Sequence, residues 1–167
     1  MEITLPKHSI DSVNTVVVLK LEEPVVAGDI RLLHSDDKNQ LLAFDATLSG
    51  DGLKFGGGQS KSYYVYNWLN KIQNLSWDIR LNKSAVFDVT IKYETSAKSG
   101  GTFNLAVNDQ ILKGTVKPTE NGNKTIEIKL GQIQLKEGVQ KLSISPENIT
   151  GDELMKIFEI NLVPVNR

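Results

Sequence analysis

Two alternating segments in the middle of the chain decide its fold. They read Asn74-Leu75-Ser76-Trp77-Asp78-Ile79-Arg80-Leu81 and Ala85-Val86-Phe87-Asp88-Val89-Thr90-Ile91-Lys92-Tyr93-Glu94. In each segment an apolar residue occupies every second position, and most residues between are polar. Because successive side chains of a strand point to opposite faces, each segment predicts a strand with one buried face and one wet face. Strands of this kind are typical of antiparallel sheets.

The same alternation returns further along the chain. Its members are Phe103, Leu105 and Val107, then Ile126, Ile128 and Leu130, then Leu142 and Ile144, and finally Phe158, Ile160 and Leu162. Turn-forming residues separate the segments, with short turns at 82–84 and 99–101 and hairpins expected at 108–109 and 136–138. Many short strands with frequent turns predict an all-β protein, an antiparallel β-sandwich of the jelly-roll kind.

The first thirty residues follow a different pattern. Residues 15–21 are apolar on both faces, which is typical of a strand that lies inside a domain. We interpret residues 1–30 as a terminal strand and linker left from a preceding β-sandwich domain, and residues 31–167 as the module itself.

Composition excludes several classes of function. The 167 residues carry a net charge of -1 and no cysteine, so disulfides and thiolate chemistry are excluded. Lysine and arginine are scattered, which argues against a nucleic-acid partner. The longest apolar runs, such as residues 16–19, are too short to cross a bilayer. His8 and His34 have no Ser or Asp at an informative spacing, so we expect no catalytic residues and no enzymatic activity from this chain alone.

Two stretches resemble a known family. The first is Asn14-Thr15-Val16-Val17-Val18-Leu19-Lys20-Leu21-Glu22-Glu23-Pro24, which is similar to the last strand of the β-sandwich that follows the catalytic barrel of family-29 glycoside hydrolases, the α-L-fucosidases. The second is Tyr66-Asn67-Trp68-Leu69-Asn70 followed by Leu75-Ser76-Trp77-Asp78-Ile79, which resembles a pattern in modules appended to such fucosidases and to related bacterial enzymes. The order of the strands is similar to the galactose-binding-like jelly rolls of carbohydrate-binding families 6 and 35.

This resemblance implies a C-terminal accessory module of a bacterial α-L-fucosidase. Its partners would be a glycan and the catalytic domain of the same parent chain. The parent would be exported to the periplasm or the extracellular space, with its signal upstream of residue 1.

Candidate sugar contacts lie in the 64–70 segment. Tyr64, Tyr66 and Trp68 occur at a spacing of two, so we expect them to share a face, where aromatic rings can stack on the C–H face of a sugar. Asn67 and Asn70 would add hydrogen bonds. The alternative is that these aromatics pack against residues 1–30 or a neighbouring domain. Trp77 is in phase with Leu75, Ile79 and Leu81, and we expect it to pack in the core of the sandwich.

No cofactor is required by this function, but the resemblance implies one candidate ion. Asp45 lies where related modules begin with an acidic residue that helps to hold a structural calcium ion, and Glu159 would be its partner. Calcium needs six to eight oxygen ligands, and the alternative is that both are ordinary surface carboxylates.

Two functions remain open at this point. The first is a non-catalytic carbohydrate-binding module that assists the catalytic domain through weak glycan binding. The second is a purely structural domain that packs on the catalytic domain. The loop at 119–123 favours the second, because it contains no aromatic residue where related modules often place a sugar-binding tryptophan.

Overall fold

The computed structural model describes residue 18 and residues 28–57, 63–118 and 125–165. The strand predicted at 15–21 and nearly all of residues 1–30 therefore lie outside the described residues, as does the loop at 119–123. The first described strand begins at Arg31. The division into residues 1–30 and 31–167 stays a prediction.

The described chain consists of strands and one short 3₁₀ helix. In chain order these are β1 (Arg31–Leu33), β2 (Asn39–Leu42), the 3₁₀ helix η1 (Ala43–Asp45), β3 (Thr47–Ser49), β4 (Lys54–Gly56), β5 (Tyr64–Tyr66), β6 (Asn74–Leu81), β7 (Ala85–Glu94), β8 (Gly101–Val107), β9 (Gln110–Val116), β10 (Ile126–Leu135), β11 (Gly138–Ile149) and β12 (Lys156–Pro164). The prediction of an all-β fold is confirmed. No helix in the described part of the chain is long and apolar enough to cross a membrane.

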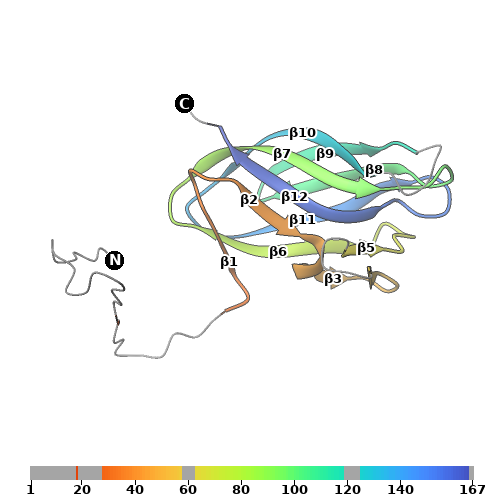
Figure 1. The fold of residues 1–167 in the computed structure, drawn as a ribbon, viewed down its shortest axis with the longest axis horizontal. Coiled ribbons are helices and arrows are strands. Elements are labelled where there is room, and N and C mark those ends of the chain that lie inside the picture. Colours follow the sequence, from red (N-terminus) through yellow and green to blue (C-terminus); the bar gives the residue numbers. More distant parts are fainter. Residues whose placement is uncertain (1–17, 19–27, 58–62, 119–124, 166–167) are drawn as a thin grey trace, which may run out of the picture.

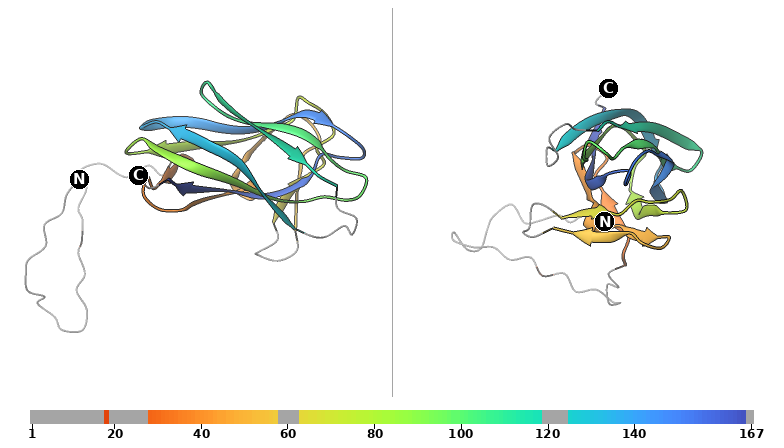
Figure 2. Two further views of the ribbon diagram at one scale, coloured as in Figure 1. Left: turned by 90° about the horizontal axis from the view of Figure 1, so that it is seen from above. Right: turned by 90° about the vertical axis from the view of Figure 1, so that its right-hand side faces the viewer.

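The strands form two facing six-stranded sheets (Figures 1 and 2). Sheet A has the order β1-β6-β11-β8-β9, and β3 also pairs with β6. Sheet B has the order β10-β7-β12-β5-β4, and β2 also pairs with β12. Among the described strands β1 with β6 is the one parallel pair. This arrangement confirms the predicted antiparallel β-sandwich.

The core lies between the two sheets and is formed by the alternating residues that the sequence singles out. In β6 and β7 the fully or almost fully buried side chains are Leu75, Trp77, Ile79, Leu81, Phe87, Val89, Ile91 and Tyr93. The Trp77 indole Nε1 donates a hydrogen bond to the Leu42 carbonyl oxygen at 2.9 Å. The interpretation of Trp77 as a core residue is therefore confirmed.

Several turns join strands of different sheets. The chain passes from sheet A to sheet B through 82–84, and from sheet B to sheet A through 136–138, because β10 pairs with β7 whereas β11 pairs with β6 and β8. The hairpin predicted at 136–138 is thus wrong, since turn residues alone do not reveal whether the next strand pairs with the previous one. The hairpin at 108–109 is confirmed, with Asn108 in the left-handed region at φ 51°.

A β-bulge in β12 changes the predicted register of the last strand. Ile157 lies opposite Tyr93 on β7 and Glu159 lies opposite Lys92, which leaves Phe158 as the extra residue. Ile157 and Ile160 are fully buried, and Phe158 is only partly buried. The prediction that Phe158 shares the buried face of Ile160 is wrong, because the bulge moves Phe158 to the outer side of sheet B.

Candidate functional site

An exposed aromatic patch lies where the chain passes from sheet B to sheet A. The 3₁₀ helix η1 makes this crossing, and it places Phe44 beside Phe55 of β4 and Tyr63 just before β5. The Phe44 ring centroid is 5.2 Å from that of Phe55 and 4.8 Å from that of Tyr63. The three residues are 46%, 47% and 41% exposed. Single exposed aromatics are common on protein surfaces, but here Phe44 contacts both Phe55 and Tyr63, and the three exposed rings form a candidate binding surface.

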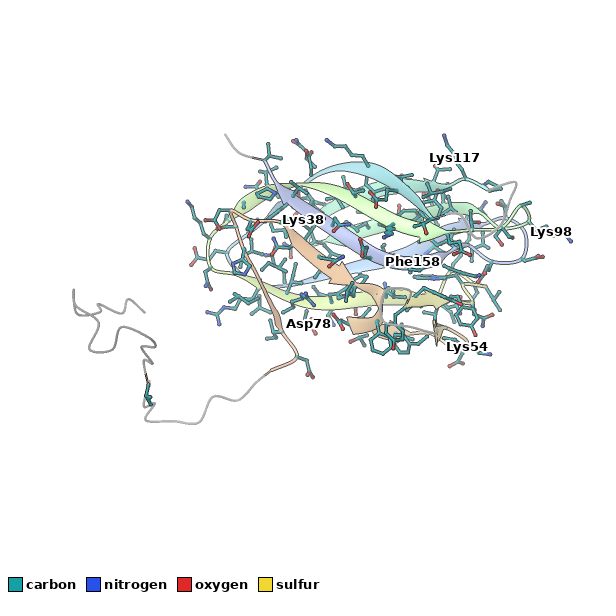
Figure 3. All side chains as sticks on the ribbon, viewed as in Figure 1. Lys38, Lys54, Asp78, Lys98, Lys117 and Phe158 are labelled. Carbon is teal, nitrogen blue, oxygen red and sulfur yellow. The ribbon has the colours of Figure 1, made fainter. Side chains whose placement is uncertain are left out.

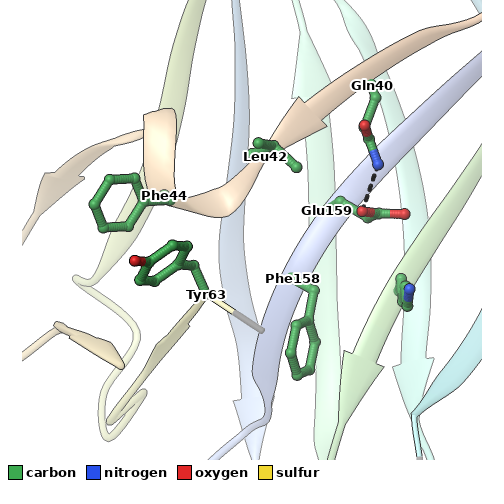
Figure 4. Close-up of a pocket in the computed structure, with 7 residues that line it drawn as sticks. Gln40, Leu42, Phe44, Tyr63, Phe158 and Glu159 are labelled. Atoms are coloured by element: carbon green, nitrogen blue, oxygen red, sulfur yellow. Dashed lines mark hydrogen bonds between the residues drawn. The ribbon is translucent and has the colours of Figure 1, made fainter. Parts of the chain in front are cut away.

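A hollow of about 380 Å³ continues from this patch across β2 and β12 (Figure 4). Figure 4 shows Phe44 and Tyr63 at one end and Gln40 and Glu159 at the other, with Leu42 and Phe158 on opposite sides between these ends. Its lining residues are Gln40, Leu42, Phe44, Tyr63, Lys92, Phe158 and Glu159. An apolar wall with a few polar groups at one end is typical of small-molecule sites.

The polar end of the hollow is built around Glu159. Gln40 Nε2 donates to Glu159 Oε2 at 2.6 Å, and Asn161 Nδ2 donates to Glu159 Oε1 at 3.0 Å. Both donors are neutral amides, and no ion pair within the described residues involves Glu159 or Lys92. The hollow therefore presents one oriented carboxylate and one ammonium group that form no ion pair with each other.

Two of the predicted sugar contacts, Tyr64 and Tyr66, lie next to this site. Their ring centroids are 5.6 Å apart, and Tyr64 lies 5.5 Å from Phe158. Both tyrosines are partly buried, and Lys156 Nζ lies 5.4 Å from the centre of the Tyr64 ring. Tyr64 contacts Phe158, Tyr66 contacts Tyr64, and neither tyrosine lines the hollow itself.

Trp68 is not available for sugar stacking. Its side chain is fully buried, and its carbonyl oxygen accepts a hydrogen bond from the Leu154 amide at 3.1 Å. The sequence prediction placed Trp68 on one face with Tyr64 and Tyr66, which assumes a continuous strand. Asn67 adopts a left-handed conformation at φ 70°, so the alternation ends there and the Trp68 side chain enters the core. The assignment of Trp68 as a sugar contact is therefore corrected.

Asn67 and Asn70 belong to a loop that is held by a buried glutamine. Gln73 is fully buried; its Oε1 accepts hydrogen bonds from the Leu69 and Asn70 amides, and its Nε2 donates to the carbonyl oxygens of Asp51 and Asn67. All four hydrogen-bonding positions of this side chain are thus filled.

The side chains of the two asparagines are also engaged in the loop. Asn67 Nδ2 donates to the Gly52 carbonyl at 2.5 Å, and Asn70 Oδ1 accepts from the Ile72 amide. Neither lines the hollow. The structure therefore gives both of them a role in shaping the loop.

The two predicted calcium ligands have separate partners. Asp45 Oδ2 lies 2.9 Å from the Arg31 guanidinium and borders a different hollow, beside Asp78 at the edge of sheet A. Glu159 is bonded to Gln40 and Asn161. Among the described residues no group of three or more His, Asp or Glu side chains is arranged to hold a metal ion.

Charged side chains elsewhere are spread over the surface. The lysines labelled in Figure 3, such as Lys38, Lys98 and Lys117, lie at separate parts of the molecule. On the outer face of sheet B the Lys129 ammonium and the Gln132 amide hold the pKa of Asp88 below its usual value, and on sheet A Lys113 does the same to the pKa of Glu147. None of these groups lines the hollow.

Sequence reasoning did not find Phe44, Phe55 or Tyr63. Phe44 ends the apolar run 41–44, which is typical of a buried segment, and no local signal marks the crossing at η1. Phe55 precedes a run of glycines, and an aromatic at this position was the one available hint. Tyr63 lies one position before the predicted Tyr64–Tyr66 pair.

The fold and site together define a class of architecture, a β-sandwich jelly roll with an open aromatic surface at one edge. No protein-family model matches the chain, and no curated protein sequence matches it.

Solved structures share its fold. A family 35 carbohydrate binding module from Clostridium thermocellum has a TM-score of 0.59 and 16% identity, and the match covers 74% of this chain and 97% of that module. A GH26-CBM35 β-(1,4)-mannanase from Podospora anserina has a TM-score of 0.62 and 20% identity over 79% of this chain. The mosquito-larvicidal Cry4Aa toxin from Bacillus thuringiensis has a TM-score of 0.65 and 15% identity over 84% of this chain.

The match corresponds to 28% of the mannanase chain and 26% of the toxin chain. At these identities the likeness establishes the fold, which is the jelly roll of family 35 modules as the sequence predicted.

Proposed function

We propose that this chain is a non-catalytic carbohydrate-binding module and that the aromatic patch with its adjoining hollow is the sugar-binding site. The observation that carries the proposal is that Phe44 contacts both Phe55 and Tyr63, and that all three rings are nearly half exposed. These rings lie beside a hollow whose polar end contains Glu159 and Lys92. The likeness to a family 35 carbohydrate binding module supports it.

The arrangement suits the chemistry of a pyranose. One face of a sugar ring carries C–H groups, which pack on aromatic rings and release water from both surfaces. The hydroxyl groups at the edge of the ring donate to carboxylates and accept from ammonium groups. In the proposed complex Phe44 and Tyr63 contact the ring face, and Glu159 and Lys92 contact its hydroxyls. Binding requires no chemical step and no cofactor.

The test is a glycan array followed by titration calorimetry with the best glycan. We expect Phe44→Ala and Tyr63→Ala each to weaken binding about tenfold. Each variant removes one of the two rings that contact the sugar, and with it about half of the apolar surface that the sugar would cover. Ile111→Ala is the matched control, because Ile111 is 60% exposed on β9 of sheet A, away from the hollow. No binding to any glycan, or equal losses in all three variants, would contradict the proposal.

We also propose that the parent protein is a bacterial glycoside hydrolase of the α-L-fucosidase family, exported to the periplasm or the extracellular space. The motifs at 14–24 and 66–79 support this placement at its C-terminal end, and the mannanase is an example of this fold within a glycoside hydrolase. The test is fucosidase activity of the full-length parent on an aryl α-L-fucoside, together with fractionation of the producing cells. A full-length parent without a hydrolase domain would contradict it.

A structural role is the second candidate, and one apolar surface favours it. Ile30, Leu32 and Val139 are 45%, 53% and 58% exposed and border a shallow hollow with Arg80 and Asn82. Ile30 and Leu32 lie at the N-terminal end of the described module. A catalytic domain that precedes the module would therefore lie near this surface. If the module is only a scaffold, Leu32→Ser and Val139→Ser should lower the melting temperature of the full-length parent and leave its polysaccharide affinity unchanged. Phe44→Ala should also leave the polysaccharide affinity unchanged.

A further inference from the structure

Glu159 is held in one orientation from two sides. Gln40 of β2 reaches Oε2, and Asn161, two residues further along β12, reaches Oε1. Asn161 is almost completely buried, so its amide has little freedom to turn away. A carboxylate oxygen has two lone pairs, and each oxygen of Glu159 uses one of them on these amides. Each therefore keeps one acceptor position for a ligand.

No ion pair within the described part of the chain involves Glu159. Its two hydrogen-bond partners are neutral, and Lys92, which lies opposite it on β7, forms no ion pair with it. A ligand that covers the hollow removes water from this carboxylate, and the lost hydration must be replaced by donors on the ligand. Hydrogen bonds to an ionised acceptor are about twice as strong as neutral ones, so a pair of hydroxyl donors gains most here.

An acidic ligand would meet the opposite situation. A sugar carboxylate near Glu159 offers no donor and adds a like charge in a site that is partly screened from water. If Lys92 pairs with such a group, the added negative charge is held beside Glu159, because Lys92 lies opposite Glu159 across the strand pair. A neutral sugar satisfies both ends, because each hydroxyl group donates one hydrogen bond and accepts others.

We propose that Glu159 determines the specificity of this site and selects a neutral pyranose with two adjacent free hydroxyl groups over sugars that carry a carboxylate. This inference rests on the proposed carbohydrate-binding function and names the substrate class of the same site. Gln40 and Asn161 are positioning residues, since they act through Glu159.

The experiment uses pairs of trisaccharides that differ only in oxidation at C6, mannotriose with mannuronotriose and galactotriose with galacturonotriose. Binding to the full 167-residue chain is measured by titration calorimetry for the wild type, Glu159→Gln and Glu127→Gln. Glu127 is an exposed residue of β10 on the same sheet and does not line the hollow, so it is the matched control. Thermal melts and circular dichroism show whether each variant is folded.

We expect the wild type to bind the neutral member of at least one pair about tenfold more tightly than the acidic member. Glu159→Gln should bring the two affinities within about threefold of each other, and Glu127→Gln should leave the ratio unchanged. Gln40→Leu should weaken the binding of the neutral sugar although this variant retains Glu159, because the carboxylate loses one of the two amides that orient it.

Equal or tighter binding of the acidic member to the wild type overturns the inference and leaves the proposed function intact. A preference that survives in Glu159→Gln does the same. Absence of binding to both members of both pairs, together with an empty glycan array, overturns the proposed function and the inference with it.

Discussion

Phe158 and Glu159 are consecutive residues of β12, and both line the same hollow. In a regular strand one of them would point into the core, because side chains alternate between faces. The bulge opposite Tyr93 and Lys92 of β7 removes this constraint, and Ile157 and Ile160 take the buried positions on either side. An aromatic wall and an oriented carboxylate therefore lie side by side, which is the pairing on which the proposed sugar site depends.

Trp68 is expected to govern stability and not binding. Trp68→Ala should lower the free energy of unfolding by about 3–5 kcal/mol, the usual cost of truncating a fully buried aromatic. Trp68→Phe should fold, with a smaller loss, and should bind sugar as the wild type does. Urea unfolding followed by circular dichroism gives the stability, and calorimetry gives the affinity. Wild-type stability in Trp68→Ala, or lost sugar binding in a stable Trp68→Phe, would restore Trp68 as a contact.

Gln73 is expected to hold the loop that contains Asn67 and Asn70. Gln73→Ala leaves two backbone amides and two carbonyl oxygens without their partner, and each such group costs about 1–3 kcal/mol when it stays buried. We therefore expect a loss of about 3 kcal/mol or more in the free energy of unfolding. Gln132→Ala is the control, since the Gln132 side chain donates one hydrogen bond, to Asp88, at the surface. Similar small losses in both variants would show that the loop does not need Gln73.

Asp88 should make stability depend on pH at the acidic end. The Lys129 ammonium at 3.0 Å and the Gln132 amide favour its ionised form, so its pKa in the folded protein lies below the usual value for aspartate. The resulting stabilisation is present above the unfolded pKa of about 4 and is lost as the pH falls through the lowered folded pKa. Carboxyl ¹³C NMR titration should show the Asp88 pKa rising towards its ordinary value in Lys129→Ala but not in Lys83→Ala. An unchanged Asp88 pKa in Lys129→Ala would be inconsistent with this ion pair.

Sugar binding is expected to persist in EDTA. Asp45 is already paired with Arg31, and Glu159 is bonded to two amides, so neither carboxylate needs a cation. A structural calcium ion at Asp45 and Glu159 is the alternative that the family resemblance implies. It would show itself as a melting temperature that rises with calcium in the wild type and not in Asp45→Asn. Loss of sugar affinity in EDTA would also favour the calcium alternative.

How much of this molecule could be predicted from sequence depends on where alternation holds. It holds through β6 and β7, where Leu75 to Leu81 and Phe87 to Tyr93 bury every second residue, so the sandwich and its core could be predicted. It fails at Asn67, whose left-handed backbone turns Trp68 inward, and at the β12 bulge, which turns Phe158 outward.

The candidate site forms at such irregular positions. Phe44 and Tyr63 lie in a 3₁₀ turn and just outside a strand end, where no period applies. Their proximity follows from the crossing of η1 between the two sheets, a long-range feature that the local sequence does not encode.

The most direct test of the central claim is a two-dimensional NMR titration of the ¹⁵N-labelled chain with the glycan that an array selects. We expect amide shifts to concentrate at Leu42 to Asp45, Tyr63, Lys92 and Phe158 to Glu159, and we expect Phe44→Ala to need about ten times more sugar for the same shifts. Shifts confined to sheet A around Ile111 or Val139, or none at millimolar sugar, would contradict it.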